Sequence, residues 1–164
     1  MRPYRDANRW TGPTLALSRI AVGAMFVLFG QYKLASSQFA HEGFSKYLTG
    51  YIQHDAVRWY AALLEQAVLP HVVPFGYAVG AVELLIGLSL VLGLSVRFMS
   101  ALGALYMVNF LLSTWWAPGT DAPLWQYFGA ELDHLSLLLL FLIFLATDAG
   151  RHWGLDSFGK RRLY

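Results

Sequence analysis

The 164-residue sequence contains no cysteine. This absence excludes disulfide bonds, thiolate metal sites and a dithiol redox relay within the chain. Charged residues are also scarce, at 13% of the sequence, whereas they make up about 25% of an average soluble domain. The sequence signatures of a phosphate-binding loop, a nucleophile elbow and a dinucleotide-binding turn are absent as well. Several common classes of soluble enzyme are therefore not indicated.

Hydrophobic residues, in contrast, make up 57% of the chain. This proportion, together with the scarcity of charge, indicates an integral membrane protein. The length suits a single domain over residues 1–164. The net charge is only +2, and the basic residues follow a membrane topology, so no nucleic-acid partner is expected.

Four segments are expected to cross the membrane, at residues 15–34, 75–95, 98–116 and 128–147. A membrane-spanning helix needs about 20 mainly apolar residues. The last uninterrupted apolar run covers only residues 135–146, so the fourth span is expected to start near Phe128. Residues 35–74 show periodic hydrophobicity, which predicts short amphipathic helices in the first outer loop. The sequence therefore predicts an all-α integral membrane four-helix bundle.

Arginine and lysine are distributed unequally between the two sides that these spans define. The N-terminal segment, the turn after the second span and the C-terminal tail hold eight of them, whereas the two opposite loops hold only Lys46 and Arg58. By the positive-inside rule, the N and C termini are expected in the cytoplasm. An even number of spans agrees with this topology.

One face of the first predicted span combines charged and small residues. At intervals of four and three residues it carries Arg19, Gly23, Phe26, Gly30 and Lys33. Residues at this spacing share one helix face. Glycines there let another helix approach closely, and charges within a membrane face protein rather than lipid. This stripe is therefore expected to pack into the bundle.

Each predicted span also brings a polar side chain to the outer half of the membrane. These residues are Gln31 and Lys33 in the first span, Glu83 in the second, Asn109 in the third, and Glu131, Asp133 and His134 in the fourth. An unpaired charge at the membrane centre costs at least about 2.5–3.5 kcal/mol. Glu83 is therefore expected to pair with Lys33 or His134, or to be protonated. On the inner side, Arg19 is expected to face Asp148.

Three interpretations of these residues remain open. In the first they are structural, with Lys33–Glu83 and Arg19–Asp148 as clamps between helices. In the second they form an outer-leaflet pocket for a quinone headgroup, and in the third they bind a ligand without redox chemistry. For the quinone pocket, the candidate catalytic residues, which handle protons, are Glu83, Lys33 and His134, and the candidate binding residues are Asn109, Gln31 and Tyr32; Tyr106 is a candidate pocket wall.

No haem or metal site is expected. Of the five histidines only His134 falls near a predicted span, and no second histidine lies at a matching depth on a neighbouring span. Glu131 and Asp133 are expected on different helix faces. Acidic residues also suit the N-terminus of a helix, which explains this pair without a bound cation.

The motif residues of the first span are followed, in the second span and the turn after it, by Glu83, Gly87, Leu92, Gly93 and Arg97. This combination, over residues 15–113, resembles the DoxX/DoxD family of small four-span membrane proteins. The resemblance implies a four-helix fold, a multi-pass location in the cytoplasmic (inner) membrane of a bacterium or archaeon, and association with membrane redox complexes. Family members resemble the small subunit of thiosulfate:quinone oxidoreductase, and others are associated with thiosulfate sulfurtransferase and superoxide dismutase. The relatives that use cysteine pairs differ from this chain, which has none.

The expected function is that of a small membrane subunit of a quinone-linked redox complex, in contact with lipid and with other protein subunits. Whether the chain is itself an enzyme is left open; as an oxidoreductase it would act with a quinone and with a partner that supplies electrons. The alternative is a non-catalytic subunit that anchors or stabilises a larger respiratory or photosynthetic assembly, docking through residues 35–74. A small transporter or channel is less favoured, because no discontinuous helix pair or inverted repeat is evident.

Overall fold

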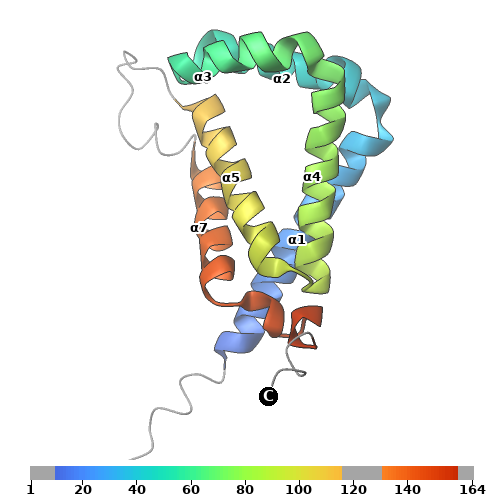
Figure 1. Ribbon diagram of the computed structural model, residues 1–164, viewed down its shortest axis with the longest axis vertical. Coiled ribbons are helices and arrows are strands. Elements are labelled where there is room, and N and C mark those ends of the chain that lie inside the picture. Colours follow the sequence, from blue (N-terminus) through green and yellow to red (C-terminus); the bar gives the residue numbers. More distant parts are fainter. Residues whose placement is uncertain (1–9, 116–130, 159–164) are drawn as a thin grey trace, which may run out of the picture.

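The computed structural model describes residues 10–115 and 131–158, and every element within these ranges is helical. The elements, with η marking short π-helical or 3-10 segments, are α1 (Thr11–Ala35), η1 (Phe39–Gly43), α2 (Phe44–Gly50), η2 (Tyr51–Asp55), α3 (Arg58–Leu63), η3 (Leu64–Val68), η4 (Leu69–His71), α4 (Val72–Leu92), α5 (Val96–Thr114), α7 (Leu132–Ala146), η5 (Ala149–Arg151) and η6 (Leu155–Ser157). The long helices α1, α4, α5 and α7 form the bundle, and α2 and α3 lie across one end of it (Figure 1).

Three helical stretches of the described chain are long and apolar enough to cross a membrane: Thr11–Ala35, Arg58–Leu92 and Val96–Thr114. They cover most of the first three predicted spans, although α4 and α5 end three and two residues earlier than expected. The described helix α7 has 15 residues, or roughly 22 Å at about 1.5 Å per residue. The expected start of the fourth span near Phe128 lies outside the described residues.

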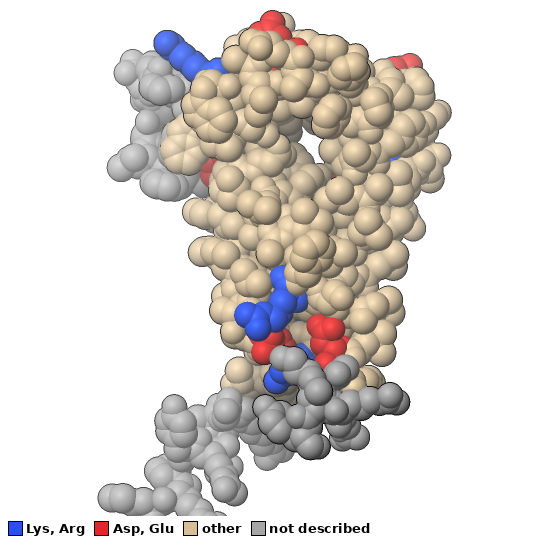
Figure 2. All heavy atoms as spheres, in the orientation of Figure 1, with Lys and Arg blue, Asp and Glu red and all other residues tan. Residues whose placement is uncertain are grey.

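The long helices are arranged in two pairs. α1 packs mainly against α4, and α5 mainly against α7. The pairs meet at the α4–α5 turn and diverge towards α2 and α3 (Figure 1). Figure 2 shows an opening through the molecule beneath α2 and α3, between α4 and α5. The two pairs therefore touch along only part of their length, and α2 and α3 bridge them at the end where they are apart.

The close contact between α1 and α4 depends on glycine. A Cβ atom added to Gly23 would lie 2.8 Å from the backbone nitrogen of Val91, and one added to Gly30 would lie 2.5 Å from that of Leu84. Such distances leave no room for a side chain, so the two backbones are in direct contact. The buried residues of α1 include Arg19, Gly23, Phe26 and Gly30. The prediction that this stripe packs into the bundle is confirmed.

Two apolar clusters hold the molecule together. The larger one fills the bundle with buried residues from α1, α4, α5 and α7 and the segment after α7: Val22, Phe26, Ile86, Leu90, Val96, Ala104, Met107, Phe141, Phe144 and Ala149. The smaller one joins α2 and α3 to the top of the bundle through Leu48, Tyr60 and Leu64. The predicted short amphipathic helices of the first loop are therefore present, with their apolar faces turned inward.

The Arg19 guanidinium group lies among backbone carbonyl groups at the narrow end of the bundle. It is fully buried and donates to the carbonyl oxygen atoms of Leu90 and Val91, in the last turn of α4. It also donates to those of His152 and Trp153, at 3.2 and 3.4 Å. The last carbonyls of a helix lack partners within it and carry partial negative charge, so a buried cation there is favourable.

The predicted ion pair between Arg19 and Asp148 is wrong. The Asp148 carboxylate instead lies 3.3 Å from Arg97 and 3.8 Å from Arg151. Asp148 adopts a left-handed backbone conformation, with φ 49°, directly after α7. The chain therefore turns beneath the bundle and presents main-chain carbonyls to Arg19, while the carboxylate faces the more exposed arginines.

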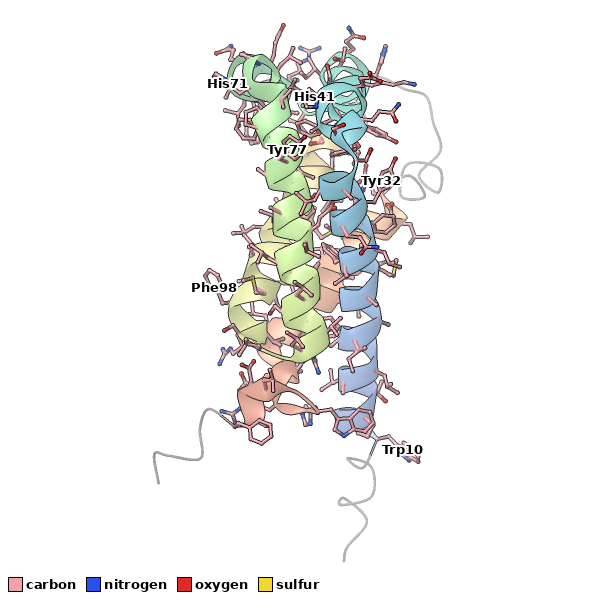
Figure 3. All side chains as sticks on the ribbon, turned by 90° about the vertical axis from the view of Figure 1, so that its right-hand side faces the viewer. Trp10, Tyr32, His41, His71, Tyr77 and Phe98 are labelled. Atoms are coloured by element: carbon pink, nitrogen blue, oxygen red, sulfur yellow. The ribbon has the colours of Figure 1, made fainter. Side chains whose placement is uncertain are left out.

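The surface agrees with a membrane location. Charged side chains gather mainly at the two ends of the molecule, and the face between them carries few of them (Figure 2). Exposed large apolar side chains occur on each long helix, for example Leu28, Leu85, Leu105 and Leu139. Trp10 marks one end of the bundle, and His41 and His71 mark the other (Figure 3). Such a band is typical of helices that face lipid.

Candidate functional site

Three polar side chains meet in the bundle interior, from α1, α4 and α5. Lys33 Nζ lies 2.5 Å from Glu83 Oε1, and the Tyr106 hydroxyl donates to the same oxygen at 2.6 Å. Glu83 is buried, with 5% of its surface exposed. The predicted pairing of Glu83 with Lys33 is confirmed. We call Lys33, Glu83 and Tyr106 the interior polar cluster.

The glycine contact between α1 and α4 brings the two charged residues together. Gly30 precedes Lys33 by three residues, as Gly80 precedes Glu83, so each glycine shares a helix face with its charged residue. A Cβ on Gly80 would lie 3.0 Å from Lys33 Cβ and 3.3 Å from the Gly30 carbonyl oxygen. The missing side chains thus allow the helix approach that places the ammonium group against the carboxylate.

The second oxygen of the Glu83 carboxylate, Oε2, has a different environment. It is buried and has no hydrogen-bond partner in the part of the chain that the structure describes. Nearly all buried polar atoms in proteins are paired, and an unpaired one costs about 1–3 kcal/mol. The interior polar cluster therefore contains one buried hydrogen-bond acceptor that no described residue satisfies.

Aromatic rings surround the cluster. The Tyr106 ring meets Phe110 edge-on, with 4.9 Å between ring centroids, and lies 6.4 Å from Phe26. Phe26 in turn packs edge-on against Phe141 of α7 at 5.4 Å. α4 and α5, which carry Glu83 and Tyr106, also border the opening in Figure 2. A few polar groups among aromatic rings are the usual lining of a small-molecule site.

His134, the alternative predicted partner of Glu83, does not contact Glu83 directly. Its ring stacks on Phe110, with 5.0 Å between centroids and 5° between planes. No hydrogen bond or ion pair joins it to Glu83 within the described residues. Phe110 contacts both His134 and Tyr106, so an aromatic side chain connects this histidine to the interior polar cluster.

The polar neighbours of His134 come from its own end of α7. Its Nδ1 atom lies 3.3 Å from Asp133 and 3.7 Å from Glu131. Glu131 is buried and accepts a hydrogen bond from Thr114 of α5 at 3.0 Å. Within the described ranges, no group of three or more acidic or histidine side chains is placed to hold a metal ion. These contacts instead hold the start of α7 against α5.

Asn109 lies on the same face of α5 as Tyr106, three residues further along. Its Oδ1 atom accepts a hydrogen bond from the Tyr60 hydroxyl of α3. The Asn109 side-chain oxygen therefore helps to hold α3 to the bundle. The side-chain amide nitrogen is the group that could donate to a ligand.

Gln31 and Tyr32 lie outside the interior polar cluster. Both are exposed, and Tyr32 lies at the outer surface of α1 (Figure 3). A helix turns by about 100° per residue, so the two residues before Lys33 point away from the face that carries it. The structure thus does not bring these two predicted binding residues to Glu83.

Tyr106 is the cluster residue that the sequence argument assigned only to a pocket wall. One available signal was its spacing of three residues from Asn109, which places it on the polar face of the third span. Aromatic residues are so frequent in this chain, at 16%, that spacing alone does not separate a hydroxyl donor from packing residues.

A family model described as DoxX matches residues 14–116, more than half of the 164-residue chain. The matched region contains all three residues of the interior polar cluster. No solved structure matches the chain.

Proposed function

The chain belongs to the DoxX family, and from this premise we propose that it is a small integral membrane subunit of a quinone-linked redox complex. In this proposal the interior polar cluster binds the headgroup of a lipid-soluble quinone carrier and exchanges protons with it. Lipid surrounds the long helices, and partner subunits supply or remove the electrons.

The observation that carries the proposal is the buried carboxylate of Glu83, with both Lys33 and Tyr106 on one oxygen. Interconversion of a quinone and its hydroquinone moves two protons as well as two electrons. Carboxyl, ammonium and phenol groups can each hold or release a proton. Their position among aromatic rings suits a flat ring with polar substituents.

We further infer that all four long helices cross the cytoplasmic membrane of a bacterium or archaeon, with both termini in the cytoplasm. α1 begins at the same end of the bundle at which η6 ends, opposite α2 and α3 (Figure 1). Arg97 and Arg151 lie together at that end, on either side of Asp148. A short span such as α7 is accommodated by local thinning of the bilayer.

Single cysteines test this topology cleanly, because the native chain has none. We expect Gln53→Cys, an exposed position in η2, to react with a membrane-impermeant maleimide on intact cells. Phe158→Cys, at a position 72% exposed after η6, is expected to react only after the membrane is permeabilised. Labelling in the reverse order would overturn the topology.

Removing both charges of the interior polar cluster is expected to weaken ligand binding without unfolding the chain. The double variant Lys33→Met/Glu83→Met leaves no unpaired charge, and replacing a buried ion pair with apolar residues is often neutral or stabilising. We expect affinity for a short-chain benzoquinone and for its hydroquinone to fall about tenfold or more, because each hydrogen bond to a charged group contributes about 1.5–3 kcal/mol. Calorimetric titration of the purified chain in lipid nanodiscs measures both.

The matched control is Lys46→Met/Glu65→Met, which makes the same two changes at exposed positions and should bind as the native chain does. Native binding that is unaffected by Lys33→Met/Glu83→Met would reject the site. A native chain that binds neither form of the carrier would reject the proposed function.

One observation favours the second candidate, a non-catalytic anchoring subunit. Tyr47 and Trp59, on the two loop helices, are 60% and 62% exposed and offer a contact surface for another protein. In that case the native chain would co-purify with a stoichiometric partner from solubilised membranes, yet bind neither form of the carrier.

A further inference from the structure

The two donors of the interior polar cluster are both directed to the same oxygen atom. Lys33 and Tyr106 lie 2.5 and 2.6 Å from Glu83 Oε1. Oε2, the other oxygen of the same carboxylate, is buried without a partner among the residues described. The Tyr106 O–H and one N–H of Lys33 are thus used within the cluster, whereas the acceptor Oε2 is left unpaired.

This asymmetry determines which kind of ligand atom fits. A phenol has one O–H group, and that of Tyr106 already points at Oε1. Lys33 has three N–H donors, of which one meets Oε1, and its Nζ also lies 5.3 Å from the centre of the Phe39 ring. A carbonyl oxygen, which can only accept, could take one of the remaining N–H groups of Lys33 but would leave Glu83 Oε2 without a partner. A hydroxyl group can donate to Oε2 and so removes the cost of that unpaired acceptor.

We infer that the interior polar cluster selects a ligand that donates an O–H hydrogen bond to Glu83 Oε2, and hence the hydroquinone form of the carrier over the quinone form. This inference rests on the proposed function and specifies its ligand. The bond satisfies a buried anionic oxygen, and hydrogen bonds to ionised acceptors are roughly twice as strong as those between neutral groups.

The surroundings of the cluster agree with an aromatic alcohol. The rings of Phe26 and Phe110 flank Tyr106 and provide apolar surface for a flat ring. α4 and α5 also border the opening beneath α2 and α3 (Figure 2).

Three probes of one shape test the selection: an alkyl benzoquinone, its hydroquinone held under anaerobic conditions, and the dimethyl ether of that hydroquinone, which keeps the ring but has no O–H group. Titrated against the native chain in lipid nanodiscs, the hydroquinone is expected to bind about tenfold more tightly than either other probe, the difference that one charge-assisted hydrogen bond makes.

Two variants identify the atom responsible. Glu83→Gln replaces one carboxylate oxygen with a donating NH₂ group, so the preference for the hydroquinone should disappear or reverse in favour of the quinone. Tyr106→Phe removes a donor to Oε1 but leaves Oε2 in place, so the preference should persist. Thermal unfolding of each variant shows that the comparison is made on folded protein.

The outcomes separate this inference from the proposed function. Equal native affinity for the three probes, tighter binding of the quinone, or a preference unchanged by Glu83→Gln would overturn the selection of a hydroxyl donor and leave the quinone-linked site standing. Failure of all three probes to bind would overturn both.

Discussion

Arg19→Met is expected to lower the free energy of unfolding by about 3 kcal/mol or more, since each buried carbonyl left without a partner costs about 1–3 kcal/mol. Arg19 is fully buried and donates to four carbonyl oxygens, two at the end of α4 and two in the segment after α7. Its removal leaves several of them facing apolar side chains. Chemical unfolding of the purified chain in detergent micelles measures the loss.

Two further variants interpret this result. Arg97→Met removes an arginine whose side chain is 63% exposed, and surface ion pairs contribute only about 0–1 kcal/mol. Arg19→Lys keeps the charge but replaces the planar fork of donors with a single ammonium group, so its effect should fall between those of the other two variants. Equal stability of Arg19→Met and Arg97→Met would show that the buried carbonyl contacts contribute nothing.

Gly30→Ala is expected to destabilise the chain by about 1–3 kcal/mol, the usual effect of forcing extra atoms into a packed interior. The added methyl group would lie 2.5 Å from the Leu84 nitrogen and 2.9 Å from the Gly80 carbonyl oxygen. Both are backbone atoms, so relief requires α1 and α4 to separate. Since Lys33 follows one turn later, the separation should also lengthen its contact with Glu83.

The chain offers a matched control for this substitution. Gly50 lies in α2, and a Cβ there would meet nothing within 4 Å. Gly50→Ala is therefore expected to be neutral or to stabilise the chain by about 0.5–1 kcal/mol, because alanine is the better helix former. Thermal unfolding of both variants in the same detergent compares their stabilities. A Gly30→Ala variant as stable as Gly50→Ala would contradict the close contact between α1 and α4.

The Lys33–Glu83 pair was among the predicted alternatives for Glu83, because it depends only on helical spacing, charge and depth in the membrane. Helical periodicity placed Gly30 and Lys33 on one face, and Gly80 and Glu83 on another. Charge in a membrane needs a partner, and depth along each span placed both Lys33 and Glu83 in the outer half of the membrane. These rules involve only spacing, composition and the thickness of the membrane.

Depth alone did not decide whether His134 contacts Glu83. The sequence offered it as an alternative partner of Glu83, but the structure stacks it on Phe110 and places acidic residues of its own helix end beside it. Depth is one coordinate, whereas contact also requires the rotation of each helix about its axis. Rotation is decided by packing between α5 and α7, which are paired with each other rather than with α1 and α4.

The sequence by itself therefore determined the membrane class, the helical segments and the short list of partners for Glu83, which included Lys33, because periodicity and the cost of buried charge are local or one-dimensional constraints. Only the tertiary structure decided that Arg19 binds backbone carbonyls, that Tyr106 joins the interior polar cluster, and that Glu83 Oε2 is left as an acceptor. Those features depend on how two helix pairs diverge and on where the chain turns after α7, which side-chain packing in three dimensions determines.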